Sequence, residues 1–205
     1  MRKAPAVVAV VALAVLLAWL LYGWHPGVEQ AAGHRPLVLA ERPTGGDFRL
    51  HGADGPVALS RFRGKVVLLY FGYTWCPDIC PTNLAIIALA LRALEPAERE
   101  QVQVMFVSVD PQRDTPERLR DYAAYFHPDI LGVTGSDAEL AQAAALYGAA
   151  YRRSEQSDSA MGYIVDHSAY TYVVDPRGRL VATLEHATPS ETLVATIRAH
   201  LPGKD

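Results

Sequence analysis

The sequence predicts a mixed α/β domain of about 160 residues, a size that can bury a substantial core. Residues 66–71 and 102–109 are two continuous runs of apolar, β-forming residues, and a helical segment at 81–94 lies between them. A strand, a helix and a strand in this order require a parallel pair of strands. Later, residues 170–174 and 180–184 flank a Pro-Gly turn and predict an antiparallel hairpin. A sheet with both kinds of pairing follows.

The first elements are short. Residues 48–50 and 57–59 flank the turn sequence Ala-Asp-Gly and predict a β-hairpin. The run 66–71 has no polar alternation, which is typical of a strand buried on both faces. Pro81 suits the first turn of the following helix, where a missing N–H costs nothing, and the helix is expected to end near Leu94.

Three further helices are predicted by start signals that pair a capping residue with a proline or a glutamate. The signals are Thr115-Pro116 for a helix to Phe126, Ser136 with Glu139 for a helix to Tyr147, and Thr188, Pro189 and Glu191 for a helix ending near Leu201. Residues 131–134 add a short strand. With the closing hairpin, this order makes a thioredoxin-like fold with an N-terminal β-hairpin the natural candidate.

The chain begins with an uncharged apolar run at residues 4–22. Nineteen residues of helix span about 28 Å, close to the thickness of the hydrocarbon layer. Arg2 and Lys3 precede the run, so its start should remain cytoplasmic. A cleaved signal peptide is the alternative, but its apolar core is usually shorter. We therefore expect a single uncleaved transmembrane helix.

These features divide the chain into three parts. We expect a transmembrane anchor at residues 1–24, a linker rich in Gly and Pro at 25–40, and the folded domain at 41–205. The predicted location is a bacterial-type inner (cytoplasmic) membrane, with the soluble domain on the periplasmic side. The 19 Lys and Arg residues are balanced by 22 Asp and Glu residues, with no basic stripe, which argues against a nucleic-acid partner.

The two cysteines, Cys76 and Cys80, are too few for a disulfide-stapled scaffold. A bridge between them would close a very short loop and would remove little unfolded-state entropy. They lie where a core strand ends and a helix begins, a position that favours ligand sites and lowers a cysteine pKa. Redox or metal chemistry is therefore the better explanation of the pair.

Two thiolates are ligands for Cu(I), zinc or iron–sulfur centres. Iron–sulfur clusters usually need four cysteines, and structural zinc needs four nitrogen or sulfur ligands. Cu(I) accepts fewer ligands, so two sulfurs and one nitrogen suffice. The third ligand would be a histidine, and His167 is the candidate because it precedes the strand at 170–174, at an edge that can face the cysteines. A structural, hydrogen-bonded histidine is the alternative at that position. The other histidines have simpler explanations in the linker, in loops or at a helix end; they include His25, His34, His127, His186 and His200.

Three separated motifs resemble the SCO/SenC family of copper chaperones. They are YTWCPDICP at 73–81, VSVDPQRDTPE at 107–117 and VDHS at 165–168, within a similarity that covers roughly residues 40–200. The resemblance implies a thioredoxin-like fold and one copper ion per chain, as Cu(I), Cu(II) or both, bound by Cys76, Cys80 and His167. It also implies a role in assembling the dinuclear copper centre of cytochrome c oxidase. The implied partners are the copper-receiving oxidase subunit and a periplasmic copper donor.

Four charged residues also match the family pattern: Asp78, Asp110, Arg113 and Asp114. Asp78 is interpreted either as an outer-sphere or docking residue, or as a solvated loop carboxylate. For the other three we expect a turn and helix-capping network.

Two functions remain open. A copper metallochaperone, which is not an enzyme, needs the three-ligand site. A membrane-anchored thiol–disulfide oxidoreductase that keeps a partner's copper-ligating cysteines reduced needs only the redox-active pair Cys76 and Cys80. His167 discriminates between the two. A peroxide-reducing enzyme or redox sensor is disfavoured, because the sequence has no resolving cysteine outside the motif.

Overall fold

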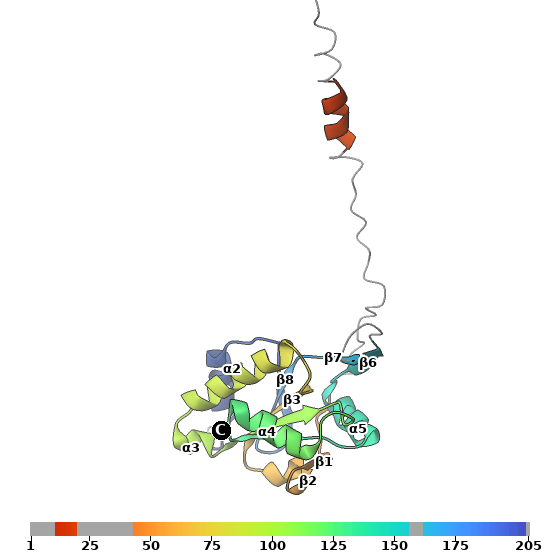
Figure 1. The fold of residues 1–205 in the computed structure, drawn as a ribbon. Coiled ribbons are helices and arrows are strands. Elements are labelled where there is room, and N and C mark those ends of the chain that lie inside the picture. The colour runs from red at the N-terminus through yellow and green to blue at the C-terminus, as the bar shows by residue number, and fades with distance from the viewer. Residues whose placement is uncertain (1–10, 20–42, 156–161, 204–205) are drawn as a thin grey trace, which may run out of the picture. The chain divides into compact units, whose positions relative to one another are not determined.

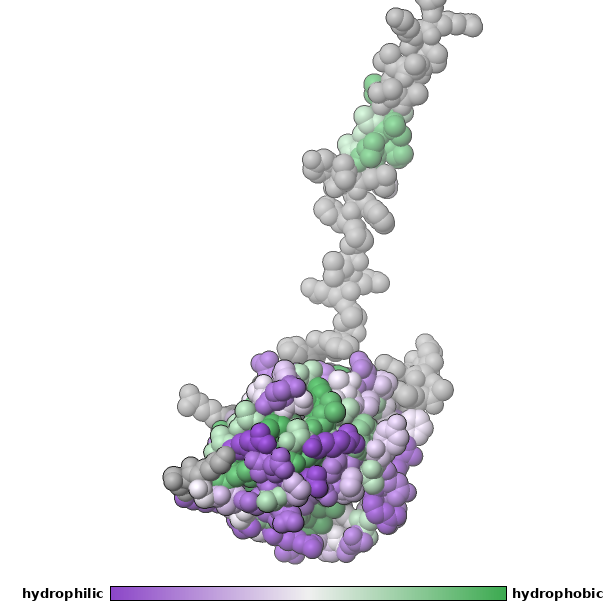
Figure 2. All heavy atoms as spheres, turned by 90° about the vertical axis from the view of Figure 1, so that its left-hand side faces the viewer, coloured by the Kyte–Doolittle hydropathy of each residue, from purple (hydrophilic) through white to green (hydrophobic). Residues whose placement is uncertain are grey.

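The computed structural model describes residues 11–19, 43–155 and 162–203. Residues 11–19 are helical, and their exposed side chains are mainly apolar (Figure 2). Among the described residues, no helix combines the length and the apolar character needed to cross a membrane. The rest of the predicted span at 4–22, and both predicted boundaries of the linker, lie outside the described residues. The N-terminal helix and the folded domain are separate units, and each is considered by itself.

A five-stranded mixed sheet forms the centre of the domain, in the order β5-β4-β3-β8-β9 (Figure 1). The central strand β3 (Val66–Gly72) is parallel to β4 (Val102–Ser108), which is parallel to β5 (Ile130–Val133). On its other side β3 is antiparallel to β8 (Thr171–Val174), which pairs with β9 (Leu180–Leu184). Every residue of β3 is buried, as expected of a strand covered on both faces. The mixed sheet and its parallel pair are therefore confirmed.

Helices connect and cover the strands. They are α2 (Ile79–Ala93), the short α3 (Pro96–Arg99), α4 (Pro116–Phe126), α5 (Asp137–Tyr147) and α6 (Ser190–Ala199). Helices α2 and α4 each connect neighbouring parallel strands, and such connections are nearly always right-handed, which places both helices on one face of the sheet. Helix α6 packs against α2.

Aromatic contacts distinguish the two faces. On the side of α2 and α4, Tyr70 stacks on Phe106, and Phe106 contacts Tyr122 of α4. On the other side, Phe71 contacts Tyr147 of α5. Alternate residues of β3 thus reach opposite layers of the core.

Two hairpins form two-stranded sheets of their own. The predicted N-terminal hairpin is present as β1 (Arg49–Gly52) and β2 (Gly55–Ala58), followed by the 3-10 helix η1 (Leu59–Phe62). The second hairpin, β6 (Tyr151–Glu155) with β7 (Tyr163–His167), forms its own two-stranded sheet. Sequence analysis did not predict it, because Arg152 and Arg153 lie in a stretch without the apolar alternation of a strand.

The helix starts test the capping predictions. Helix α4 has Thr115 as its N-cap, with the Thr115 hydroxyl accepting from the Arg118 amide at 3.3 Å. Helix α5 has the predicted capping box of Ser136 and Glu139. The box predicted for α6 is wrong: Pro189 is the N-cap, and the Thr188 hydroxyl donates to the Glu185 carbonyl instead. This hydrogen bond closes the preceding turn and leaves no side-chain cap on α6.

Candidate metal centre

The two cysteines lie in the connection from β3 to α2. Cys80 is in the first turn of α2 and is fully buried, whereas Cys76 in the loop is 8% exposed. The Cys80 amide, in the first turn of α2, has no hydrogen-bond acceptor within the helix and donates to the Cys76 sulfur at 3.4 Å. Neither cysteine is in a disulfide. At the end of β3, Gly72 gives the Cys80 sulfur room, because a Cβ at Gly72 would lie only 2.6 Å from it.

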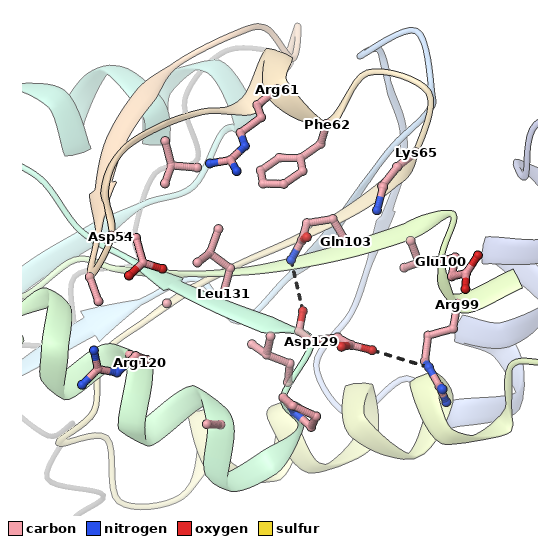
Figure 3. A pocket seen from close by; sticks show the side chains of 18 of the residues that line it. Asp54, Arg61, Phe62, Lys65, Arg99, Glu100, Gln103, Arg120, Asp129 and Leu131 are labelled. Carbon is pink, nitrogen blue, oxygen red and sulfur yellow. Dashed lines mark hydrogen bonds and ion pairs between the residues drawn. The ribbon is translucent and has the colours of Figure 1, made fainter. Parts of the chain in front are cut away.

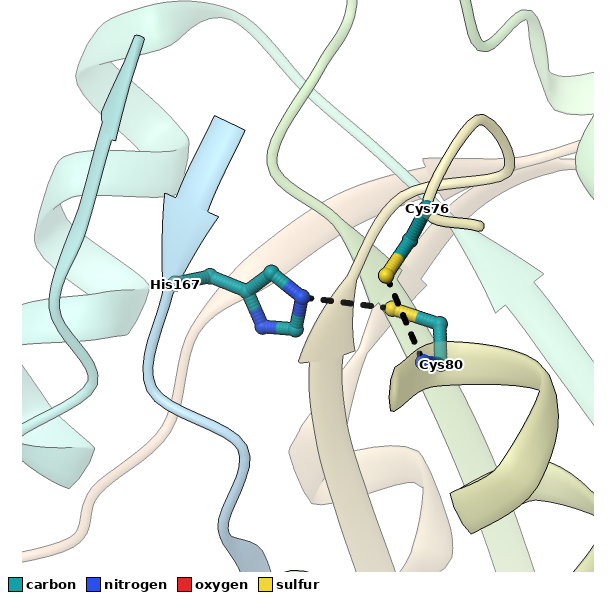
Figure 4. Close-up of side chains that lie close together, drawn as sticks. All are labelled: Cys76, Cys80 and His167. Carbon is teal, nitrogen blue, oxygen red and sulfur yellow. Dashed lines mark hydrogen bonds between the residues drawn. The ribbon is translucent and has the colours of Figure 1, made fainter. Parts of the chain in front are cut away.

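The histidine comes from a distant segment. His167 is the last residue of β7, and its Nε2 atom lies 3.3 Å from the Cys80 sulfur (Figure 4). Its Nδ1 atom lies 3.2 Å from the Ser168 carbonyl oxygen, a contact that fixes the orientation of the ring. The rings of Tyr70 and Tyr73 meet the imidazole edge-on, at centroid distances of 6.4 and 5.8 Å. One potential ligand atom from each of Cys76, Cys80 and His167 lies within 4.8 Å of the other two.

The two sulfurs are electrostatically unequal. The hydrogen bond with Cys80 is the main cause that lowers the pKa of Cys76 to about 4; burial opposes it and a hydrogen bond with His167 reinforces it. Burial raises the pKa of the Cys80 thiol well above its usual range, and the neighbouring Cys76 raises it further. At neutral pH the reduced pair therefore holds one proton, on the deeper sulfur. Cys76 is the thiolate.

This donor set fits a soft metal ion. Metal–sulfur and metal–nitrogen bonds of about 2.0–2.3 Å allow ligand atoms of one ion to be at most about 4.6 Å apart. The three atoms are within 4.8 Å of one another before any ion draws them together. Two thiolates with one imidazole suit Cu(I) best, since structural zinc would need a fourth ligand. Among the described residues, His, Cys, Asp and Glu side chains form no other group of three close enough to hold a metal ion.

A buried carboxylate supports the cysteine loop. Asp114 is fully buried and accepts from the Thr74 amide at 2.8 Å, from the Thr74 hydroxyl at 2.6 Å and from the Ser108 hydroxyl at 2.6 Å. Arg118 donates to the Thr74 hydroxyl at 2.8 Å. Asp114 therefore ties the residue two positions before Cys76 to the end of β4.

The predicted turn and helix-capping network is only partly correct. The amides of Arg113 and Asp114 donate to the Asp110 carbonyl and form the turn, and Thr115 is the N-cap of α4, as the sequence predicts. The Asp110 carboxylate pairs locally with Arg113, and the Asp110 and Asp114 carboxylates also bind side chains from other segments of the chain. The sequence signal available for these residues is a carboxylate shortly after a buried strand. This signal does not identify the partners, which are Tyr163 for Asp110 and Thr74 for Asp114.

The remaining predicted candidates lie elsewhere. Asp78 is exposed and makes no side-chain cap hydrogen bond, and its carboxylate accepts from the Thr82 hydroxyl at 3.4 Å, as a solvated loop carboxylate would. Three other histidines have local surroundings: His127 accepts from the Asp129 amide, His186 is exposed, and His200 contacts the Thr196 carbonyl. His25 and His34 lie outside the described residues.

A hollow of about 950 Å³ lies at the opposite end of the sheet, near the start of β3 and β4 (Figure 3). Arg61, Lys65, Arg99 and Asp129 are among its lining residues, and Arg99 pairs with Asp129 at 3.5 Å. It contains none of the three metal-ligand candidates, so the cysteine–histidine cluster is a compact, separate site.

Comparison with known proteins identifies the family. The SCO1/SenC family model matches residues 39–202. The Sco1 protein of Thermus thermophilus, solved in its apo form, is 44% identical with a TM-score of 0.70, over 80% of this chain and 95% of that one. Yeast Sco1, solved with copper bound, is 34% identical with a TM-score of 0.70, over 79% of this chain and 90% of that one.

Curated relatives give the same result. The mitochondrial SCO2 homolog of Bos taurus is 39% identical over 158 residues, which are 76% of this chain and 59% of the bovine protein. The chain thus spans less than two thirds of that relative's length. The family match covers the domain that carries all three motifs, and the solved relatives share its thioredoxin-like fold. The chain therefore belongs to the SCO1/SenC family.

Proposed function

We propose that this chain is a copper metallochaperone that binds one copper ion through Cys76, Cys80 and His167. In this proposal the chain delivers the ion for assembly of the dinuclear copper centre of cytochrome c oxidase. The single observation that carries the proposal is the convergence of two buried sulfurs and one imidazole nitrogen within 4.8 Å. The copper-bound structures of the yeast and Bradyrhizobium japonicum relatives support copper as the metal.

The electrostatics of the site favour a thiolate-bound cation. Cys76 is already ionised at neutral pH, and a bound cation would stabilise the second thiolate on Cys80 by removing its proton. The start of α2 adds positive partial charge next to the sulfurs. With two thiolates, Cu(I) leaves the centre with a charge of −1 and Cu(II) leaves it neutral, so the helix start favours the monovalent ion.

Delivery requires that an acceptor's ligands replace those of the chaperone. Cys76 is 8% exposed and His167 is half-buried, whereas Cys80 is fully buried. The acceptor would therefore displace Cys76 and His167 first, and the bond to Cys80 would break last. The exposed Trp75 and Ile79 border this loop and offer an apolar rim at which the copper-receiving oxidase subunit, or a periplasmic copper donor, can dock.

The location proposed is the outer face of a bacterial inner membrane. Residues 4–22 are long and apolar enough in sequence for a single span, Arg2 and Lys3 mark the cytoplasmic end, and the described part of this run is helical and apolar. In this arrangement residues 1–24 are the anchor, 25–40 the linker and 41–205 the copper-binding domain. The anchor would keep the domain near its membrane-bound client.

One observation favours a second function for the same residues. A low-pKa, more accessible Cys76 paired with a buried, protonated Cys80 is the asymmetry of an attacking and a resolving thiol. A thiol–disulfide oxidoreductase that reduces a partner's copper-ligating cysteines would use this pair. His167 has no required part in that exchange.

A transfer experiment separates the two functions. The copper-loaded chain is mixed anaerobically with a copper-free, fully reduced soluble domain of the receiving oxidase subunit, and copper is measured in each protein after separation. The metallochaperone proposal predicts transfer by the wild type and little by His167→Ala, which should load poorly. A parallel assay uses the reduced, copper-free chain and the same acceptor domain with its cysteines oxidised to a disulfide. If the wild type transfers no copper in the first assay, while the wild type and His167→Ala both reduce the acceptor in the second, the oxidoreductase is the correct function.

A further inference from the structure

The position of His167 depends on a hairpin that is not part of the main sheet. Among the described residues, strands β6 and β7 pair only with each other, whereas both cysteines lie at the junction of the central strand and α2. The base of the hairpin is closed by the Ser168 amide, which donates to the Ala150 carbonyl at 2.8 Å, and by the Ala150 amide, which donates to the Ser168 hydroxyl at 3.1 Å. His167 lies at this base, and the other end of its strand begins at Tyr163, four residues earlier, so a contact that holds Tyr163 also restrains the strand that carries the imidazole.

That far end is bound by a buried carboxylate. The Tyr163 hydroxyl, at the start of β7, donates to Asp110 Oδ1 at 2.6 Å. Asp110 is fully buried, lies two residues after the end of β4 and also pairs with Arg113. Arg113 in turn donates to the Tyr163 carbonyl at 3.0 Å, and its guanidinium lies 3.7 Å from the centre of the Tyr163 ring. On the hairpin's other strand, Arg153 lies 4.6 Å from the centre of the same ring and 3.9 Å from Asp110.

The same short segment also holds the cysteine loop. Asp110 binds Tyr163 of the histidine hairpin, and Asp114, four residues later, binds Thr74 of the cysteine loop. Both carboxylates are fully buried and both follow β4. The cysteine loop and the histidine hairpin, which are far apart in sequence, are therefore both hydrogen-bonded to the same turn after β4.

We propose that Tyr163 is a positioning residue, and that its hydrogen bond to Asp110 is a latch that keeps His167 at ligand distance from the two sulfurs. The inference rests on the proposed copper function and deepens it. Breaking the latch loosens the far end of the β6–β7 hairpin, while the Asp114–Thr74 contact keeps the cysteine pair in place. The chain then retains a two-sulfur site with a loosely held imidazole.

Tyr163→Phe tests the latch with little risk to folding, because the ring keeps its stacking on Arg113 and Arg153 and only the hydroxyl is lost. The first measurement is hydrogen exchange of the reduced, metal-free full chain in detergent. Amides of β6 and β7 should exchange about tenfold faster than in the wild type, with the main sheet unchanged. Tyr147→Phe is the matched control: it removes another tyrosine hydrogen bond, to the Gly46 carbonyl at 2.8 Å, and should leave the hairpin unchanged.

The second measurement is an anaerobic Cu(I) competition titration of the wild type, Tyr163→Phe, His167→Ala and the double variant. Tyr163→Phe should weaken copper binding about tenfold, the scale of a lost outer-shell contact. The double variant should bind no more weakly than His167→Ala alone, because the latch acts through the imidazole. Tyr147→Phe should match the wild type.

Two results would overturn the latch: unchanged hairpin exchange in Tyr163→Phe, or a double variant whose loss of affinity is the full product of the two single losses. Failure of the wild-type chain to bind copper would contradict the proposed function instead. The exchange measurement on the metal-free protein would still decide whether Tyr163 restrains the hairpin.

Discussion

Gly72 is the position where a single added carbon should disturb the metal site most directly. A Cβ at Gly72 would lie 2.6 Å from the Cys80 sulfur and 3.0 Å from Phe106 Cε2, whereas ordinary contacts begin at 3.4 Å. In Gly72→Ala the sulfur must therefore move by about 3.4 − 2.6 = 0.8 Å, or the central strand must shift. A metal–ligand bond tolerates a displacement of only about 0.2 Å. The substitution should thus weaken copper binding and destabilise the fold together.

The expected magnitudes are those of overpacking a tight core. We expect a loss of about 1–3 kcal/mol in the free energy of unfolding, measured by urea denaturation of the metal-free protein. Copper affinity should fall about tenfold or more in an anaerobic competition titration.

Two other strand glycines provide matched controls: Gly132 in β5 of the same sheet, and Gly52 at the end of β1 in the N-terminal hairpin. At Gly132 an added Cβ would lie 2.6 Å from the Leu119 backbone, away from the metal site, so Gly132→Ala should lose stability but keep its copper affinity. At Gly52 the nearest atoms would be 3.5 Å away, so Gly52→Ala should change neither. Wild-type copper affinity in Gly72→Ala, or an equal loss in Gly132→Ala, would refute the reasoning.

Three further predictions follow from the charges at the site. Apparent copper affinity should fall by about tenfold or more per pH unit from pH 8 to pH 5, because the raised pKa of Cys80 means that binding releases its proton throughout this range; a flat profile in a competition titration would contradict a two-thiolate site. In the reduced, metal-free protein, iodoacetamide at pH 6 should label Cys76 and spare Cys80, since the pKa of about 4 keeps Cys76 ionised; peptide mass spectrometry that finds equal labelling would exclude the asymmetry. Asp114→Asn should lose about 1–3 kcal/mol of unfolding free energy in urea, because the amide nitrogen cannot accept from Thr74 or Ser108; an unchanged midpoint would show that the carboxylate does not brace the loop.

Local sequence signals were sufficient for most of the fold. The unbroken apolar runs of β3 and β4 and the caps of α4 and α5 depend on neighbouring residues, and each was predicted close to its observed position. The cysteine pair was also accessible, because its place between a strand and a helix start is a local property. The cap predicted at Thr188 was wrong for a reason that is also local: the Thr188 hydroxyl donates to the Glu185 carbonyl and closes a competing turn.

The support of the site could not be predicted, because it depends on contacts between distant segments. The carboxylate of Asp114 reaches Thr74 across 40 positions, and that of Asp110 meets Tyr163 across 53. In the sequence alone, an aspartate that forms a turn or caps a helix looks the same as one that binds a distant side chain. The sequence therefore predicts only the turn and capping network. The β6–β7 hairpin was missed because its strands are stabilised by these ties and by charged pairs rather than by an apolar alternation. Without the hairpin, His167 could be proposed as a ligand from position and resemblance, but nothing explained how it would be held.

Copper binding by Cys76, Cys80 and His167 is the central claim, and an anaerobic Cu(I) titration of the reduced full chain in detergent tests it most directly. Cys76→Ser, His167→Ala and the exposed-histidine control His186→Ala would be measured beside the wild type against a competing chelator. We predict one tightly bound copper per chain in the wild type and in His186→Ala, none in Cys76→Ser, and binding weakened at least about tenfold in His167→Ala. No tight copper in the wild type, or an affinity indifferent to His167, would contradict the three-ligand site and leave the redox-active cysteine pair as the function of the chain.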